Sequence, residues 1–181
     1  WDCVPIMAAP QRLGEALMNE LPVTEAMDRR NGLVYTLGYA FIFLAAPVTY
    51  VDVVPATLCN RLGANATVAN LPAATYLMGG IAPLFLSMTV PHRLEHAIVV
   101  YANGLTAVFL GLVFLALVLP FPHWVPLLVV VGHGFFQGIA YSTATVFTLQ
   151  CLARGTTQAG RNRMLQKTFF LAPVCAVIGS L

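Results

Sequence analysis

The sequence predicts an all-α integral membrane protein, a helical bundle of four complete transmembrane helices plus part of a fifth. Two observations predict this fold class. Of the 181 residues, 59% are hydrophobic and only 9% are charged, whereas an ordinary soluble domain carries about 25% charged residues. The apolar residues also fall into runs of about 20, the length that a helix needs to cross a bilayer. Backbone groups that face lipid must bond within their own segment, so these runs are expected to be helices.

The first element, residues 1–31, is predicted to be a cytoplasmic leader ahead of the first span. It holds most of the acidic residues of the chain, and its stretch 11–21 can form a short amphipathic helix. The leader lacks the charged start, apolar core and small-residue cleavage site of a signal peptide. The chain begins at Trp1 rather than Met, and its last apolar segment is too short for a full span. We therefore expect a fragment of a longer protein.

Complete spans are expected at four places in residues 32–181, and a fifth, incomplete span closes the chain. The expected spans cover residues 33–54, 71–90, 97–119, 125–148 and, incompletely, 168–181. The links between them are a polar connection over 59–70, a tight loop over 91–96, a very short turn over 120–124 and a basic loop over 151–167. Prolines within a span do not exclude a helix in a membrane.

The distribution of Lys and Arg predicts the orientation. With the leader placed inside, eight of the nine Lys and Arg residues are cytoplasmic, and only Arg61 lies outside. An excess of Lys and Arg marks the cytoplasmic side. His123 and Trp124 then lie at the outer interface, where amphipathic rings are enriched. The sequence therefore predicts a multi-pass protein of the cell membrane with a cytoplasmic N-terminus.

Polar side chains within the spans are the candidate functional residues, because they are costly in lipid. In span 125–148, His133, Gln137 and Tyr141 recur every fourth residue and form one helical stripe near the midplane. Histidine can bind and release a proton near neutral pH. We expect this stripe to contact a substrate or a proton. The alternative is that His133 and Gln137 only hydrogen-bond to neighbouring helices.

Two further side chains are weaker candidates for a substrate or proton site. Asp52 is the only acid within an expected span, near its outer end. It is either a proton-coupling group or a hydrated interfacial acid that pairs with Arg61. Tyr39 lies deep enough in the first span to face a cavity.

Small residues predict close contacts between helices. In the fourth span, Gly134, Gly138 and Ser142 are spaced four apart, a pattern that lets two helices approach closely. Gly79 and Gly80 in the second span are expected to serve the same purpose or to allow a bend. The sequence has no zinc signature, no phosphate-binding loop and no Ser-His-Asp pattern. We therefore expect no metal, no cofactor, no nucleic acid and no enzymatic activity.

The order of these features resembles the major facilitator superfamily. The match rests on the cytoplasmic start, the short basic loop between spans two and three, the minimal outer turn and the glycine-rich fourth span. The family's loop motif reads G-x-x-x-D-R-x-G-R-R, and this chain reads TVPHRLEHA there. Arg93 matches the first Arg of the motif, His92 replaces its Asp, and Glu95 replaces its second Gly. Glu95 is a candidate for the missing carboxylate.

The resemblance implies a protein of two six-helix halves with a midplane cavity that opens alternately to each side. This chain would supply most of the N-terminal half, and its partners would be the missing C-terminal half, the lipid bilayer and a small solute. The implied function is secondary active transport, coupled to an ion or a proton. The alternative is an integral membrane subunit or assembly factor that transports nothing. An intramembrane enzyme is less favoured, because one His and one Asp at different depths do not form a catalytic pair.

Overall fold

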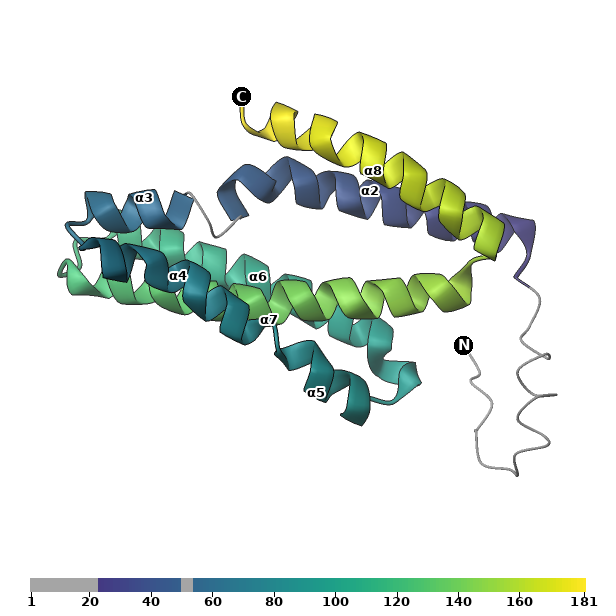
Figure 1. The fold of residues 1–181 in the computed structure, drawn as a ribbon, viewed down its shortest axis with the longest axis horizontal. Coiled ribbons are helices and arrows are strands. Elements are labelled where there is room, and N and C mark those ends of the chain that lie inside the picture. The colour runs from purple at the N-terminus through teal and green to yellow at the C-terminus, as the bar shows by residue number, and fades with distance from the viewer. Residues whose placement is uncertain (1–22, 50–53) are drawn as a thin grey trace.

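The computed structural model describes residues 23–49 and 54–181, and within these ranges the chain is helical and contains no β-strand. Its elements, in chain order (Figure 1), are α2 (Glu25–Thr49), α3 (Val54–Arg61), α4 (Ala66–Gly79), α5 (Ala82–Thr89), the 3₁₀ turn η1 (His92–Leu94), α6 (Glu95–Val118), α7 (Trp124–Gly155) and α8 (Gln158–Gly179).

Three of the described helical segments are long and apolar enough to cross a membrane, namely Ala66–Thr89, His92–Val118 and Trp124–Gly155. This finding confirms the expected class, an all-α membrane protein. The expected count of four complete spans stays a prediction. Residues 50–53 lie outside the described residues. They include the candidate Asp52 and belong to the last turn of the expected first span, residues 33–54.

α7 is the central helix, and it packs mainly against α4 and α6. α2 and α8 form a separate pair that lies side by side and runs in the same direction (Figure 1). At the start of this pair, the backbone N–H of Thr157 donates to Asp28, and at its far end Gly179 lies against the backbone of Leu44. The pair contacts α7 much less than its two helices contact each other.

Large apolar side chains cover the outside of the molecule. Met88 is 87% exposed, Leu77 is 73% exposed and Phe170 is 78% exposed, and many other Leu, Val and Phe residues are similar. A soluble monomer rarely exposes apolar surface on this scale. The expected lipid environment explains it, because hydrocarbon chains solvate such side chains.

Helices continue through the stretch where the sequence suggested a basic loop. α7 extends to Gly155 and α8 already begins at Gln158, so the expected loop over 151–167 is wrong. Residues in this stretch such as Arg, Gln, Leu and Lys are good helix formers. The side chain of Thr157 starts α8, because it accepts a hydrogen bond from the Gly160 N–H at 3.0 Å.

The second expected span is a broken helix. α4 ends at Gly79 and α5 begins at Ala82, with a turn at Gly80 and Ile81. Pro83 lies in the first turn of α5. Proline has no N–H to donate and its ring clashes with the preceding turn, so a continuous helix is unfavourable here. The expected polar connection before this span is also shorter, because α3 and α4 leave only residues 62–65 between them.

Candidate functional site

His133 and Gln137 lie in the middle of α7 and are almost completely buried. Their exposed fractions are 3% and 5%. Within the part of the chain that the structure describes, the Nε2 atom of His133 and the Oε1 atom of Gln137 have no hydrogen-bond partner. An unsatisfied buried polar atom is costly and calls for a specific explanation. These two atoms therefore offer hydrogen-bonding capacity that the described residues do not use.

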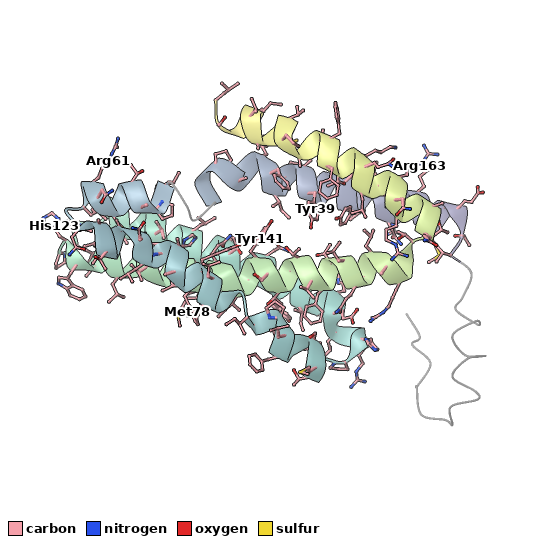
Figure 2. The ribbon with its side chains drawn as sticks, in the orientation of Figure 1. Tyr39, Arg61, Met78, His123, Tyr141 and Arg163 are labelled. Carbon is pink, nitrogen blue, oxygen red and sulfur yellow. The ribbon has the colours of Figure 1, made fainter. Side chains whose placement is uncertain are left out.

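Among the described residues, the other side chains expected at the site, Tyr141 and Tyr39, do not add to this pair of unused atoms. Tyr141 continues the stripe one turn along α7, where it is partly buried and has an interaction partner. Tyr39 packs between two aromatic rings of α2, with centroid distances of 4.6 Å to Tyr35 and 6.2 Å to Phe43. Figure 2 shows Tyr39 midway along α2 and Tyr141 midway along α7. Asp52 lies outside the described residues.

The glycines of α7 lie at its contact with α4. A Cβ atom on Gly134 would collide with the Pro72 carbonyl, and one on Gly138 would collide with the Tyr76 carbonyl. Gly79 of α4 lies in the same way against the Phe135 carbonyl. The two backbones are therefore in direct contact, which only residues without a side chain allow.

Two further features join α4 to α7. The Thr75 hydroxyl lies 3.1 Å from the Val131 carbonyl, to which it can donate across the contact. Gly80 and Ser142 also meet there, since a Cβ on Gly80 would lie 3.4 Å from the Ser142 hydroxyl oxygen. This contact fixes the rotation of α7 and so the direction in which the His133 stripe points.

Two open grooves lie on the surface of the described helices. One groove of about 630 Å³ is formed by α5, α6 and α7 and includes Leu86, Tyr101 and Thr143. A second of about 450 Å³ lies near Trp124 and Val68. Neither groove is lined by His133 or Gln137. Because His133 and Gln137 are themselves only 3% and 5% exposed, a solute could reach them only after the surrounding helices move.

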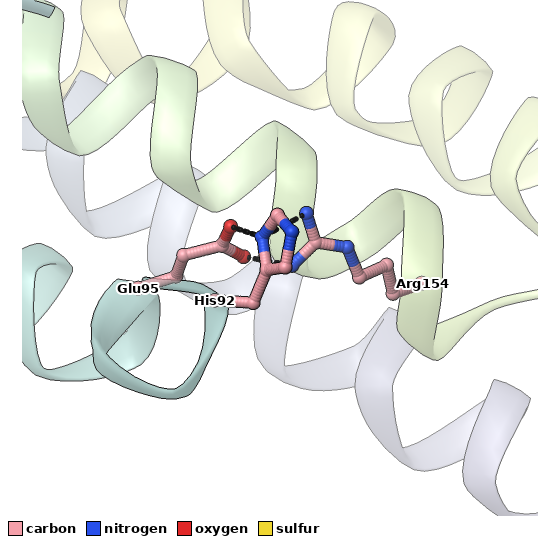
Figure 3. Close-up of polar contacts among 3 residues, drawn as sticks. All are labelled: His92, Glu95 and Arg154. Atoms are coloured by element: carbon pink, nitrogen blue, oxygen red, sulfur yellow. Dashed lines mark hydrogen bonds and ion pairs between the residues drawn. The ribbon is translucent and has the colours of Figure 1, made fainter. Parts of the chain in front are cut away.

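A polar cluster joins η1 and α6 to the C-terminal end of α7 (Figure 3). The Glu95 side chain is only 4% exposed, and its Oε2 lies 2.5 Å from the Arg154 Nη1. His92 Nδ1 lies 2.9 Å from both Glu95 Oε1 and Arg154 Nη2. One nitrogen cannot serve both partners in the same way. With a proton it donates to Glu95, and without one it accepts from Arg154.

Sequence reasoning singled out Arg93 and Glu95 in this loop, but it missed Arg154. Arg93 is exposed, and the carboxylate of Glu95 is bound by Arg154 instead. Arg154 was expected in a loop, whereas it belongs to the last turn of α7. The only available signal was the helix-favouring composition around residue 154.

Comparison with known protein families, curated proteins and solved structures finds no match to this chain. Among the described residues, no group of three or more His, Cys, Asp or Glu side chains is placed to hold a metal ion. The functional proposal therefore rests on the membrane-spanning class and on the side chains of α7.

Proposed function

We propose that this chain is part of a secondary active transporter, similar in kind to the major facilitators, that moves a small solute by alternating access with ion or proton coupling. The observation that carries the proposal is a pair of buried atoms, His133 Nε2 and Gln137 Oε1, that have no hydrogen-bond partner among the described residues. Both lie in a helix that is long and apolar enough to span a membrane.

The depth of this pair supports a transport site. His133 follows Trp124 by nine residues, so it lies roughly 13 Å along the helix from the expected outer interface. That depth is close to the bilayer midplane, where secondary transporters bind their substrates. Each unsatisfied group costs about 1–3 kcal/mol. A solute or proton that pairs with them would recover this free energy when it binds.

The arrangement of the helices supports alternating access. The α2–α8 pair is well packed internally but makes few contacts with α7, which itself packs closely on α4 and α6. Units that are joined weakly can shift relative to each other at low cost. Alternating access requires parts of a bundle to shift in this way.

The basic residues support a cytoplasmic N-terminus in the cell membrane. Seven of the eight described Lys and Arg residues lie at the start of α2, in η1, at the end of α7 or in the first half of α8. Arg61 is at the opposite end of the molecule, together with His123, whereas Arg163 is at the basic end (Figure 2). This distribution is the one that the positive-inside rule describes.

Solute flux tests the proposal. The full native protein would be reconstituted into liposomes that contain a pH-sensitive dye, and amino acids, sugars, organic acids and inorganic cations would be added in turn. We expect one class to be taken up or to change the internal pH. His133→Ala should reduce the initial rate by about tenfold, the loss expected for a hydrogen bond of about 1.4 kcal/mol.

The matched control is His96→Ala, which removes an exposed histidine outside the stripe and should leave the rate unchanged. Wild-type flux in His133→Ala would show that the stripe is not the site. If no solute moves while the protein is folded, and only substitutions at Gly134 and Gly138 have effects, the non-transporting membrane subunit is the better description.

Reading the gene onward from the codon for Leu181 tests the family resemblance separately. Seven further spans, with a longer cytoplasmic link after the sixth, would agree with two bundles that rock against each other. A reading frame that stops after five or six spans would remove the second bundle and favour the subunit.

A further inference from the structure

The N-terminal halves of α2 and α8 carry the basic residues of one end of the molecule. Thr157 N–H donates to Asp28 Oδ1 at 3.0 Å, and Asn31 Nδ2 donates to the Gly155 carbonyl at 2.7 Å. The first bond ties the start of α8 to α2, and the second ties α2 to the last residue of α7, which α8 closely follows. The basic side chains of both helices consequently lie at the same end, and this α2–α8 basic cluster consists of Arg29, Arg30, Arg161, Arg163 and Lys167.

The positive charge of the cluster is not neutralised by the described residues. The ion pairs found among these residues all use Glu95, and none includes a member of the cluster. The two acids of α2 are Glu25 and Asp28, and Asp28 is engaged with the start of α8. The Nε atom of Arg161 is buried without a hydrogen-bond partner in the described chain. The cluster therefore retains unused donors and an excess of positive charge.

Exposed apolar side chains begin directly beyond the cluster. On α2, Leu33 and Val34 are each 63% exposed, and on α8, Phe169 and Phe170 are 76% and 78% exposed. The surface of this helix pair thus changes from cationic to apolar within about one turn. Lys167, the deepest of the cations, is exposed next to the two phenylalanines. Its flexible stem can extend along apolar surface and carry the ammonium group to the headgroup level.

We propose that the α2–α8 basic cluster binds the phosphate headgroup of an anionic phospholipid. The acyl chains of the lipid would lie against the exposed apolar side chains of the two helices, which include Leu33, Val34, Phe169 and Phe170. Arginine suits this role, because its planar guanidinium group donates two parallel hydrogen bonds to a phosphate. A soluble anion would gain nothing from the adjoining apolar surface, so the continuity of the two surfaces favours a lipid. The proposal requires the membrane-spanning class but not transport.

The test measures lipid selectivity in a bilayer. The full native protein would be reconstituted in phosphatidylcholine with a trace of spin-labelled phosphatidylglycerol or, separately, spin-labelled phosphatidylcholine. The motionally restricted fraction reports the lipid at the protein surface. We expect phosphatidylglycerol to be preferred, by about fivefold for each cation that engages it. The triple variant Arg161→Gln, Arg163→Gln, Lys167→Gln should lose most of this preference.

Two control variants separate charge from other effects. Arg61→Gln removes an exposed cation at the opposite end and should keep the preference. Arg161→Lys with Arg163→Lys preserves the charge and should keep most of it. If the triple variant does not fold, the wild-type protein in about 0.5 M NaCl serves instead, because screening should abolish a preference that charge creates.

Three results would overturn the proposal. The first is equal restriction of the two lipids by the wild-type protein. The second is a preference that survives both the triple substitution and high salt. The third is displacement of spin-labelled phosphatidylglycerol by glycerol phosphate at millimolar concentration, which would identify the cluster as a site for a soluble phosphate.

Discussion

At the scale of single residues, the buried carboxylate of Glu95 depends on Arg154. We predict that Arg154→Ala lowers the free energy of unfolding, because the Glu95 carboxylate, whose exposed fraction is 4%, would lose Arg154 and keep only His92 as a partner among the described residues. A hydrogen bond to a charged group contributes about 1.5–3 kcal/mol. Arg154 is itself 44% exposed, so solvent screens part of the pair and the lower half of that range is expected. Thermal unfolding in detergent, followed by helical circular dichroism, measures it.

Two further variants make this residue-scale prediction specific. Arg93→Ala removes an exposed arginine from the neighbouring turn and should change stability by less than about 0.5 kcal/mol. Adding Glu95→Gln to Arg154→Ala should restore part of the loss, since a neutral amide is cheaper to bury than a carboxylate that has lost its arginine. Equal losses in Arg154→Ala and Arg93→Ala would show that the ion pair does not stabilise the fold.

At the scale of helices, the contact between α4 and α7 depends on glycine. Replacing Gly by Ala inside a helix normally stabilises it by about 1 kcal/mol. At Gly138 the new methyl group would collide with the Tyr76 carbonyl, so we predict a net destabilisation of about 1–3 kcal/mol from overpacking. Gly132→Ala is the matched control on the same helix, because a Cβ there meets no atom within 4 Å. If both variants unfold at the same temperature, close backbone contact is not what holds α4 against α7.

The helices also show how much of the fold could be predicted from the sequence. The expected span 97–119 nearly coincides with α6, Glu95–Val118, because an apolar run bounded by prolines and polar residues is a reliable signal. Span 125–148 gave the start of α7 but not its end at Gly155. Hydropathy indicates where a helix leaves the lipid. The helix itself can continue into water, because its backbone hydrogen bonds do not depend on apolar side chains. The beginning of α8 was missed for the same reason.

The candidate site shows a similar limit. His133 and Gln137 could be selected from the sequence, because polar side chains in an apolar run are rare. The sequence could not predict that these two side chains have unused hydrogen-bonding atoms among the described residues, because this depends on which helices surround α7. The ion pair of Glu95 with Arg154 joins residues 59 positions apart, and no local pattern predicts such a pair.

At the scale of the whole molecule, the charge distribution predicts which end faces the cytoplasm. The basic end includes the starts of α2 and α8, so both helices would leave the cytoplasm in the same direction.

We predict that a membrane-impermeant maleimide added to intact cells labels Thr67→Cys but not Asn162→Cys, in a background without other cysteines. Both positions are exposed, they lie near opposite ends of the bundle, and neither substitution changes a Lys or Arg that sets the topology. Permeabilised cells should label both, which controls for intrinsic reactivity. Labelling of Asn162→Cys alone in intact cells would place the basic end outside, and it would move the proposed lipid site to the outer leaflet.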